Sequence, residues 1–99
     1  FENYVAAEII KRGITLKYWR TKSKAEVDFI IEHDGEIIPI EVKLNASEKI
    51  GKSLHSFIDV YKPKRAFVVS YKGEFTTTKK NDCTIFFTDV LSLLNALDT

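Results

Sequence analysis

Asp28, Glu41 and Lys43 are the residues of this chain whose types and spacing could do chemistry. Twelve residues separate Asp28 from Glu41, and Lys43 follows two positions later. If Asp34-Gly35 is the turn of a β-hairpin, the two carboxylates stand directly opposite each other, with Cβ atoms only ~4.5–5.5 Å apart, and like charges placed there are destabilising. A divalent cation bound by both carboxylates would explain the pair.

The hairpin that must position these side chains spans residues 25–43. Asp34-Gly35 lies between two runs rich in β-branched and aromatic residues, the strongest short-range signal of a two-residue hairpin turn. This turn sets a register in which the facing pairs are His33–Glu36, Phe29–Ile40 and Asp28–Glu41. Strand alternation then places Lys43 on the same face as Glu41. The sequence therefore predicts that an Asp, a Glu and a Lys converge on one face of the sheet.

The rest of the chain alternates between strand and helical patterns, which predicts an α/β domain. We expect a helix over residues 1–12, strands over 15–22, 26–32, 36–43, 65–70 and 83–87, a ragged edge strand at 74–78, a helix that Pro63 ends, and a last helix after residue 88. The strand, helix, strand order after the hairpin implies a parallel crossover. The predicted architecture has three layers, with a central mixed β-sheet flanked by helices.

Two details of the later helices are also predicted. Either Ser47 or Ser53 caps the second helix, and the pattern does not choose between them. Thr88 caps the last helix. The buried side of that helix is formed by Val90, Leu91, Leu94 and Leu97.

Composition bounds the protein class. Ninety-nine residues, 44% apolar and 29% charged, fit one globular domain over residues 1–99. No apolar run is long enough to cross a membrane, no signal peptide is visible, and the single cysteine, Cys83, fits a reducing compartment, so a cytoplasmic location is expected. The net charge of +1 means that any nucleic-acid surface must be a local patch. Because the chain opens at Phe1, inside a predicted helix, we expect it to be part of a longer protein.

Arg20, Lys22 and Lys24 gather at the end of the strand that leads into the Asp28 strand. Tyr18 and the neighbouring Trp19 supply aromatic surface beside them. Basic and aromatic side chains at the rim of an acidic site suit a phosphate backbone that enters it. The alternative is a solvated hairpin tip.

Glu2 falls within the apolar stripe of the first helix, whose other members are Val5, Ala6 and Ile9. A carboxylate there is costly unless it is paired or bound to something. The alternative is that Glu2, so near the chain end, simply lies in water. His33 and His55 have no histidine partner at metal-ligand spacing, so a histidine metal site is not expected.

Glu2, Asp28, Glu41 and Lys43 occur in the order of the PD-(D/E)XK nuclease signature, and the chain resembles that superfamily at this point. A closer resemblance covers nearly the whole chain. The segments F-E-N-Y-V-A-A-E-I-I, Y-W-R-T-K-S-K-A-E-V-D-F-I-I and I-P-I-E-V-K are similar to the C-terminal domain of a family of prokaryotic AAA-type ATPases. One departure is Val27, which stands where the signature has proline.

The resemblance implies a restriction-endonuclease-like fold and metal-dependent phosphodiester hydrolysis. Asp28 and Glu41 would bind Mg²⁺ or Mn²⁺ together with the backbone carbonyl of Val42, and Glu2 would complete the shell directly or through water. Lys43 would orient or deprotonate water, or stabilise developing charge. The substrate would be DNA, with RNA as the second candidate. An attached ATPase domain would be the partner, and ATP would bind only there.

Two alternatives to this interpretation remain open. The tripeptide (Asp/Glu)-x-Lys is common by itself, and Lys43 could simply pair with Glu26 and Glu41 on a salt-bridged sheet face. The domain would then be a non-catalytic module that binds nucleic acid or a protein partner for the attached ATPase. An exposed edge strand could also pair two copies of the chain into a homo-oligomer.

Overall fold

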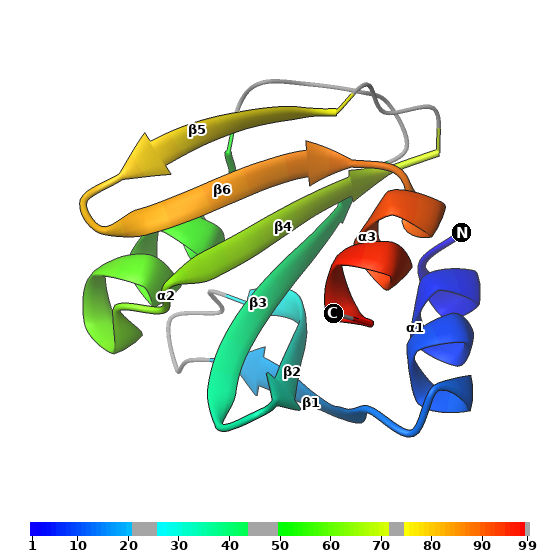
Figure 1. Ribbon diagram of the computed structural model, residues 1–99. Coiled ribbons are helices and arrows are strands. Elements are labelled where there is room, and N and C mark those ends of the chain that lie inside the picture. The colour runs from blue at the N-terminus through cyan, green and yellow to red at the C-terminus, as the bar shows by residue number, and fades with distance from the viewer. Residues whose placement is uncertain (21–25, 44–49, 72–74, 99) are drawn as a thin grey trace.

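The computed structural model describes residues 1–20, 26–43, 50–71 and 75–98, with the backbone but not the side chains of Arg20 and Glu26. The elements are α1 (Glu2–Lys11), β1 (Thr15–Arg20), β2 (Glu26–His33), β3 (Glu36–Lys43), α2 (Lys52–Tyr61), β4 (Arg65–Ser70), β5 (Thr76–Lys80), β6 (Cys83–Thr88) and α3 (Val90–Leu97) (Figure 1). This order confirms the predicted one. The uncertain edge strand is a regular strand, β5, which pairs with β6 along its whole length.

The six strands form one mixed sheet in the order β1-β2-β3-β4-β6-β5. β1, β2 and β3 form an antiparallel meander. β3, β4 and β6 are parallel, and β5 returns antiparallel to β6. The predicted parallel crossover from β3 through α2 to β4 is therefore confirmed. It brings the carboxyl ends of β3 and β4 to the same edge of the sheet.

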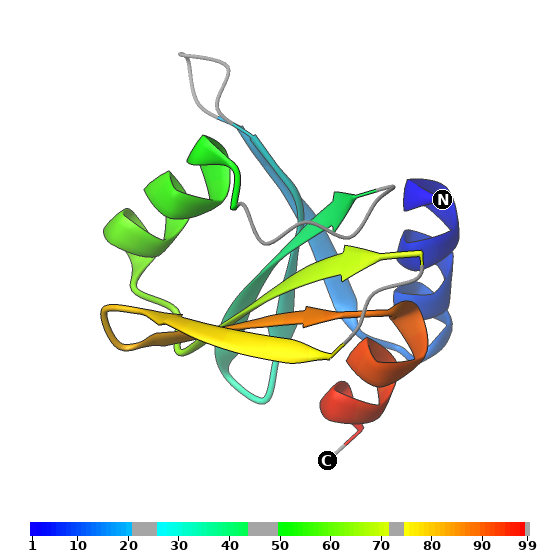
Figure 2. The same ribbon diagram turned by 90° about the horizontal axis from the view of Figure 1, so that it is seen from above.

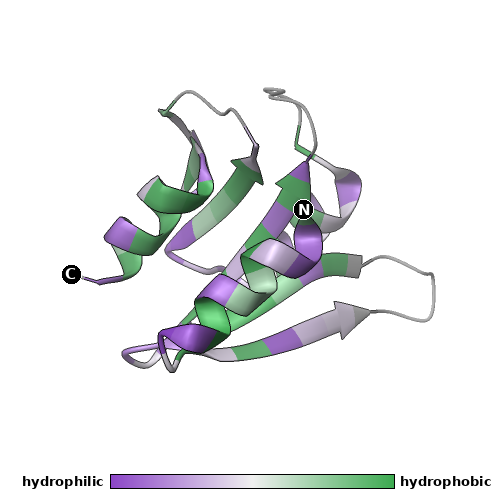
Figure 3. Ribbon diagram, turned by 90° about the vertical axis from the view of Figure 1, so that its right-hand side faces the viewer, coloured by the Kyte–Doolittle hydropathy of each residue, from purple (hydrophilic) through white to green (hydrophobic). Residues whose placement is uncertain are grey.

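Helices cover both faces of this sheet, so the predicted three-layer α/β architecture is confirmed (Figures 1 and 2). Alternate residues of β4 divide between the two cores, as strand geometry requires. Phe67 and Val69 pack with α1 and α3. Ala66 and Val68 pack with α2. In Figure 3 the helices α1 and α3 carry both hydrophobic and hydrophilic segments, as expected of helices that bury one side.

The predicted N-cap residues of α2 and α3 are wrong. Gly51 is the N-cap of α2, and Ser53 lies inside the helix, while Ser47 is outside the described residues. Asp89, not Thr88, caps α3, because its Oδ1 accepts a hydrogen bond from the Ser92 N–H at 2.8 Å. Thr88 still belongs to β6 and is buried there.

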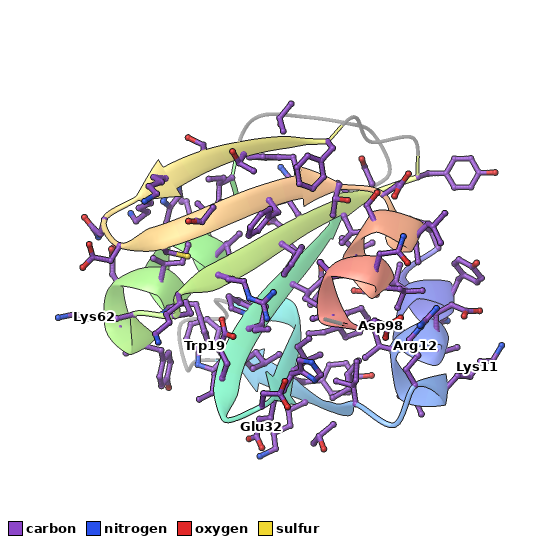
Figure 4. All side chains as sticks on the ribbon, in the orientation of Figure 1. Lys11, Arg12, Trp19, Glu32, Lys62 and Asp98 are labelled. Atoms are coloured by element: carbon purple, nitrogen blue, oxygen red, sulfur yellow. The ribbon has the colours of Figure 1, made fainter. Side chains whose placement is uncertain are left out.

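The buried side of α3 also differs in part from the prediction. Leu94 and Leu97 are buried as expected, but Leu91 is 65% exposed and Leu93 takes its place in the core. α3 lies beside α1, and the Arg12 Nη1 donates to Asp98 Oδ2 at 2.6 Å between the ends of these two helices (Figure 4). Within the described ranges, none of the helices is long and apolar enough to cross a membrane.

Candidate metal and phosphodiester site

The turn of the β2–β3 hairpin is the one that the sequence predicts. Asp34 and Gly35 both have positive φ, 51° and 77°, as a two-residue turn of type I′ requires. The paired residues run from His33–Glu36 at the turn to Phe29–Ile40, which confirms the predicted register over that stretch. The next residues along the two strands are Asp28 and Glu41. The hairpin therefore brings both carboxylates to its end farthest from the turn.

A β-bulge re-aims Asp28 at this point. The flanking pairs between β1 and β2 are Lys17–Ile30 and Trp19–Val27, so Tyr18 alone faces the two residues Asp28 and Phe29. The Oδ2 of Asp28 accepts a hydrogen bond from the backbone N–H of Val42 at 2.7 Å. The Asp28 side chain thus reaches across to β3 and bonds to the residue that lies between Glu41 and Lys43.

Glu41 lies against the N-terminus of α2. Its carboxylate accepts a hydrogen bond from the backbone N–H of Gly51, the N-cap of that helix. A Cβ at position 51 would lie 2.5 Å from Glu41 Oε1. Gly51 has an ordinary φ of −67°, so lack of space, rather than backbone conformation, favours glycine here. The positive end of the helix dipole also favours a carboxylate at this position.

The second oxygen of Glu41 has a different environment. Glu41 Oε2 is buried, and no described residue forms a hydrogen bond with it. The Lys43 Nζ is 3.9 Å away, beyond hydrogen-bonding distance, and the two side chains are only 23% (Lys43) and 19% (Glu41) exposed. Leaving a buried acceptor without a partner costs about 1–3 kcal/mol. This atom is therefore where a further ligand would be stabilised.

The charges around Glu41 act on its pKa in both directions. Burial raises the pKa of Glu41 above its ordinary value, and the negative charge of Asp28 raises it further. Lys43, the Gly51 N–H and His55 act in the opposite direction. The negative charge of Asp28 therefore acts on Glu41, but Lys43 lowers the pKa by more than Asp28 raises it, and burial is the main cause of the raised pKa.

His55 is the residue that sequence reasoning missed. It lies one helical turn after Gly51, and its backbone N–H donates to the Gly51 carbonyl at 3.2 Å. Its side chain lowers the pKa of Glu41, and its Nδ1 is buried without a hydrogen-bond partner among the described residues. The available signal was the i, i+4 relation between Gly51 and His55, which puts both on one side of the helix.

The remaining predicted residues stay predictions. Glu2 is exposed in the first turn of α1, and α1 covers the face of the sheet opposite to α2. Lys22 and Lys24 lie outside the described residues, and Arg20 is placed by its backbone alone, as the last residue of β1. The Val42 carbonyl as a ligand is likewise untested.

Asp28 and Glu41 offer the hard oxygen ligands that Mg²⁺ and Mn²⁺ prefer, and the buried Glu41 Oε2 fits such an ion. Within the part of the chain that the structure describes, however, His, Cys, Asp and Glu side chains do not form a group of three or more that could hold a metal ion. The carboxylates of Asp28 and Glu41 are thus suitable ligands for a divalent cation, but the described side chains supply only this pair and do not surround an ion.

Comparison with known proteins assigns the chain to a family. No curated protein matches the chain. A family model described as a domain of unknown function (DUF4143) matches residues 1–91 and so spans α1 through the start of α3. The chain therefore belongs to the DUF4143 family.

Proposed function

We propose that this domain hydrolyses phosphodiester bonds in DNA in a metal-dependent reaction, on a restriction-endonuclease-like fold of the PD-(D/E)XK type. The observation that carries the proposal is the buried Glu41 Oε2, which has no hydrogen-bond partner among the described residues although Asp28 and Lys43 flank it. The ion pair between this oxygen and the Lys43 Nζ is long, at 3.9 Å, and leaves the oxygen without a hydrogen bond from the described residues. The oxygen can therefore still accept a ligand.

Each residue then has a defined role. Asp28 and Glu41 would hold Mg²⁺ or Mn²⁺, together with the Val42 carbonyl. Such an ion, when bound there, would lower the pKa of water and offset charge on the phosphoryl oxygens. Lys43 would orient the attacking water through Nζ, or accept its proton there; its Nζ lies 3.9 Å from Glu41 Oε2.

The substrate would enter along the end of β1. Tyr18 is 69% exposed, and Trp19 is partly exposed and stacks edge-on against Phe57 of α2. Exposed aromatic rings can stack with bases, and the basic residues Arg20, Lys22 and Lys24 would contact phosphates. DNA is the proposed substrate and RNA the second candidate. The resemblance to ATPase-associated domains supports an attached AAA-type ATPase as the partner.

Cleavage of branched, single-stranded and duplex DNA in the presence of Mn²⁺ tests the proposal. Lys43→Ala should lower the rate by about 10²-fold or more, in the range seen when a proton-transfer group is lost. Lys17→Ala is the matched control, because Lys17 pairs with Glu32 at 2.7 Å on the exposed surface, where ion pairs contribute little. Equal cleavage by wild type and Lys43→Ala would contradict the proposal.

A second candidate function is a non-catalytic module that binds nucleic acid or a protein partner. The observation that favours it is the bond from the Gly51 N–H to the Glu41 carboxylate, which gives this acid a structural use at the start of α2. DNA binding in a mobility-shift assay that equals wild type in Lys43→Ala, without cleavage by either protein in Mn²⁺, would favour this function over hydrolysis.

A further inference from the structure

Ser70 is a buried polar residue in the strand next to the candidate site. It is the last residue of β4 and is only 5% exposed. Within the described part of the chain, the only other polar or charged residue that is buried is Thr88. Burying a hydroxyl costs free energy unless the group forms a hydrogen bond. The position of Ser70 therefore calls for a partner, and the sheet determines which groups can reach it.

The register of β3 and β4 places Ser70 beside Lys43. The two strands are parallel and end at the same edge of the sheet (Figure 1), where Glu41 pairs with Val68 and Lys43 pairs with Ser70. Val68 packs with α2, and the Glu41 carboxylate lies against Gly51 at the start of that helix. Because side chains two residues apart on a strand share a face, Lys43 and Ser70 are neighbours on the α2 face of the sheet.

The ammonium of Lys43 and the hydroxyl of Ser70 are complementary groups. A lysine Nζ only donates hydrogen bonds, whereas a serine Oγ can accept them. The 3.9 Å between Lys43 Nζ and Glu41 Oε2 is beyond hydrogen-bonding distance, so this ion pair does not fix the direction in which the ammonium points. A hydrogen bond from Lys43 Nζ to Ser70 Oγ would fix that direction and would also give the buried hydroxyl a partner.

We propose that Ser70 is a positioning residue of this site, whose Oγ accepts a hydrogen bond from Lys43 Nζ and holds the ammonium toward the attacking water. This inference rests on the proposed function. It adds a residue of β4 to a site otherwise built on the β2–β3 hairpin. In this role Ser70 touches neither DNA nor metal and acts only through Lys43. Its removal should therefore lower kcat and leave KM unchanged.

Thr88 supplies a matched control at the end of the neighbouring strand β6. It is buried as Ser70 is, and its Oγ1 donates to the Asp89 carbonyl at 3.2 Å. Thr88 pairs with Val69, which packs with α1 and α3, so it lies on the face of the sheet opposite to Ser70. Thr88→Val thus removes a buried hydroxyl at the same edge of the sheet, away from Lys43. Thermal unfolding checks that this variant and Ser70→Ala are folded.

A double-mutant cycle of DNA cleavage in Mn²⁺ tests the proposal. Ser70→Ala should lower kcat by about tenfold or more, because a small misplacement of a reacting group can cost as much as about 10²-fold. Thr88→Val should cleave as wild type does. In the Lys43→Ala background, Ser70→Ala should cause no further loss, because the two residues act as a unit. An equal fold-loss from Ser70→Ala in both backgrounds would overturn the inference.

Nuclear magnetic resonance gives a second readout that does not depend on activity. In wild type, nuclear Overhauser effects should connect the ε-protons of Lys43 to the β-protons of Ser70. The nitrogen signal of Lys43 Nζ, identified by its loss in Lys43→Ala, should shift in Ser70→Ala and keep its position in Thr88→Val. Equal shifts in these two variants, or no Overhauser effect in wild type, would overturn the inference.

The outcomes separate the two proposals. If Lys43→Ala loses cleavage while Ser70→Ala cleaves at the wild-type rate, the proposed function stands and the role of Ser70 is refuted. If wild type does not cleave DNA although Ser70→Ala shifts the Lys43 signal, the contact exists, but the proposed function fails and the role of Ser70 in the reaction fails with it. A loss of rate in Ser70→Ala that disappears in the Lys43→Ala background supports both.

Discussion

Two glutamates of strand β3, Glu36 and Glu41, have similar burial and opposite surroundings. Glu36, at the turn end, binds Arg65 through both oxygens: the Arg65 Nε donates to Oε1 at 3.1 Å and its Nη2 donates to Oε2 at 3.2 Å. Glu41, at the other end, has a buried Oε2 without a hydrogen-bond partner among the described residues. The side chains are 25% and 19% exposed.

The difference separates a structural acid from one suited to bind a ligand. The Glu36–Arg65 fork joins the hairpin to β4 and satisfies both carboxylate oxygens. At Glu41 the ion pair with Lys43 is long, at 3.9 Å, and Asp28 adds a second negative charge. Burial alone therefore does not distinguish the two acids. The unsatisfied oxygen of Glu41 is what supports it, rather than Glu36, as the proposed ligand.

The largest expected effect comes from filling the space beside Glu41. Gly51→Ala places a Cβ 2.5 Å from Glu41 Oε1, so the carboxylate or the start of α2 must move. Because this atom is the end of a flexible side chain, the carboxylate can turn aside, but it then loses its bond from the Gly51 N–H. We expect a loss of about 1.5–3 kcal/mol in the free energy of unfolding, as for hydrogen bonds to charged groups, together with weaker Mn²⁺ binding. Urea denaturation and calorimetry measure the two effects.

Gly35→Ala is the matched control for that variant. Gly35 has a positive φ of 77°, but a Cβ added there would have nothing within 4 Å, so alanine strains the turn without contacting Glu41. It should lower stability and leave Mn²⁺ affinity unchanged. Wild-type affinity in both glycine variants would mean that the contact between Gly51 and Glu41 does not shape the site.

A smaller loss of stability is expected at the turn end of β3, where both oxygens of Glu36 accept hydrogen bonds from Arg65. Glu36→Gln replaces a charged acceptor by a neutral one and weakens the fork with Arg65, so stability should fall by about 1 kcal/mol. Metal binding and cleavage should not change. Urea denaturation measures the first and calorimetry the second. If Glu36→Gln lost as much Mn²⁺ affinity as Asp28→Asn, Glu36 and Glu41 would no longer differ in their relation to the metal.

The smallest expected effect is a gain in stability rather than a loss. Because burial raises the pKa of Glu41, its ionisation opposes folding as the pH rises above the ordinary value of 4.5. At pH 7, Glu41→Gln should therefore be slightly more stable than wild type, by less than about 1 kcal/mol in the free energy of unfolding. It should unfold at a slightly higher temperature.

The stability difference between Glu41→Gln and wild type should disappear below pH 4.5, where Glu41 is protonated in both the folded and the unfolded states. Thermal unfolding in metal-free buffer between pH 4 and pH 8 tests this. A Glu41→Gln variant that is less stable than wild type at neutral pH would show that the charge of Glu41 stabilises the fold.

The sequence predicted those features that depend on local chemistry. Asp34-Gly35 predicted the turn, and the turn predicted the register from His33–Glu36 to Phe29–Ile40. Hydrophobic periodicity predicted the element order and both helical layers. These signals act over a few residues and need no knowledge of the tertiary packing.

The features that were missed depend on contacts between distant elements. The bulge at Asp28 arises where β2 pairs with β1 on one side and β3 on the other, which no local pattern encodes. His55 joins the site only because α2 begins against Glu41. The sequence predicts the cap of α3 at Thr88, one residue before Asp89, because threonine is also a capping residue; the burial of Thr88 in β6 decides against it.

Titration of Mn²⁺ into wild type, Glu41→Gln and Glu36→Gln tests most directly whether Glu41 is a metal ligand. We predict that Glu41→Gln lowers the Mn²⁺ affinity at least about 100-fold, while Glu36→Gln binds as wild type does. Undiminished Mn²⁺ binding by Glu41→Gln would contradict the assignment of Glu41 as a ligand.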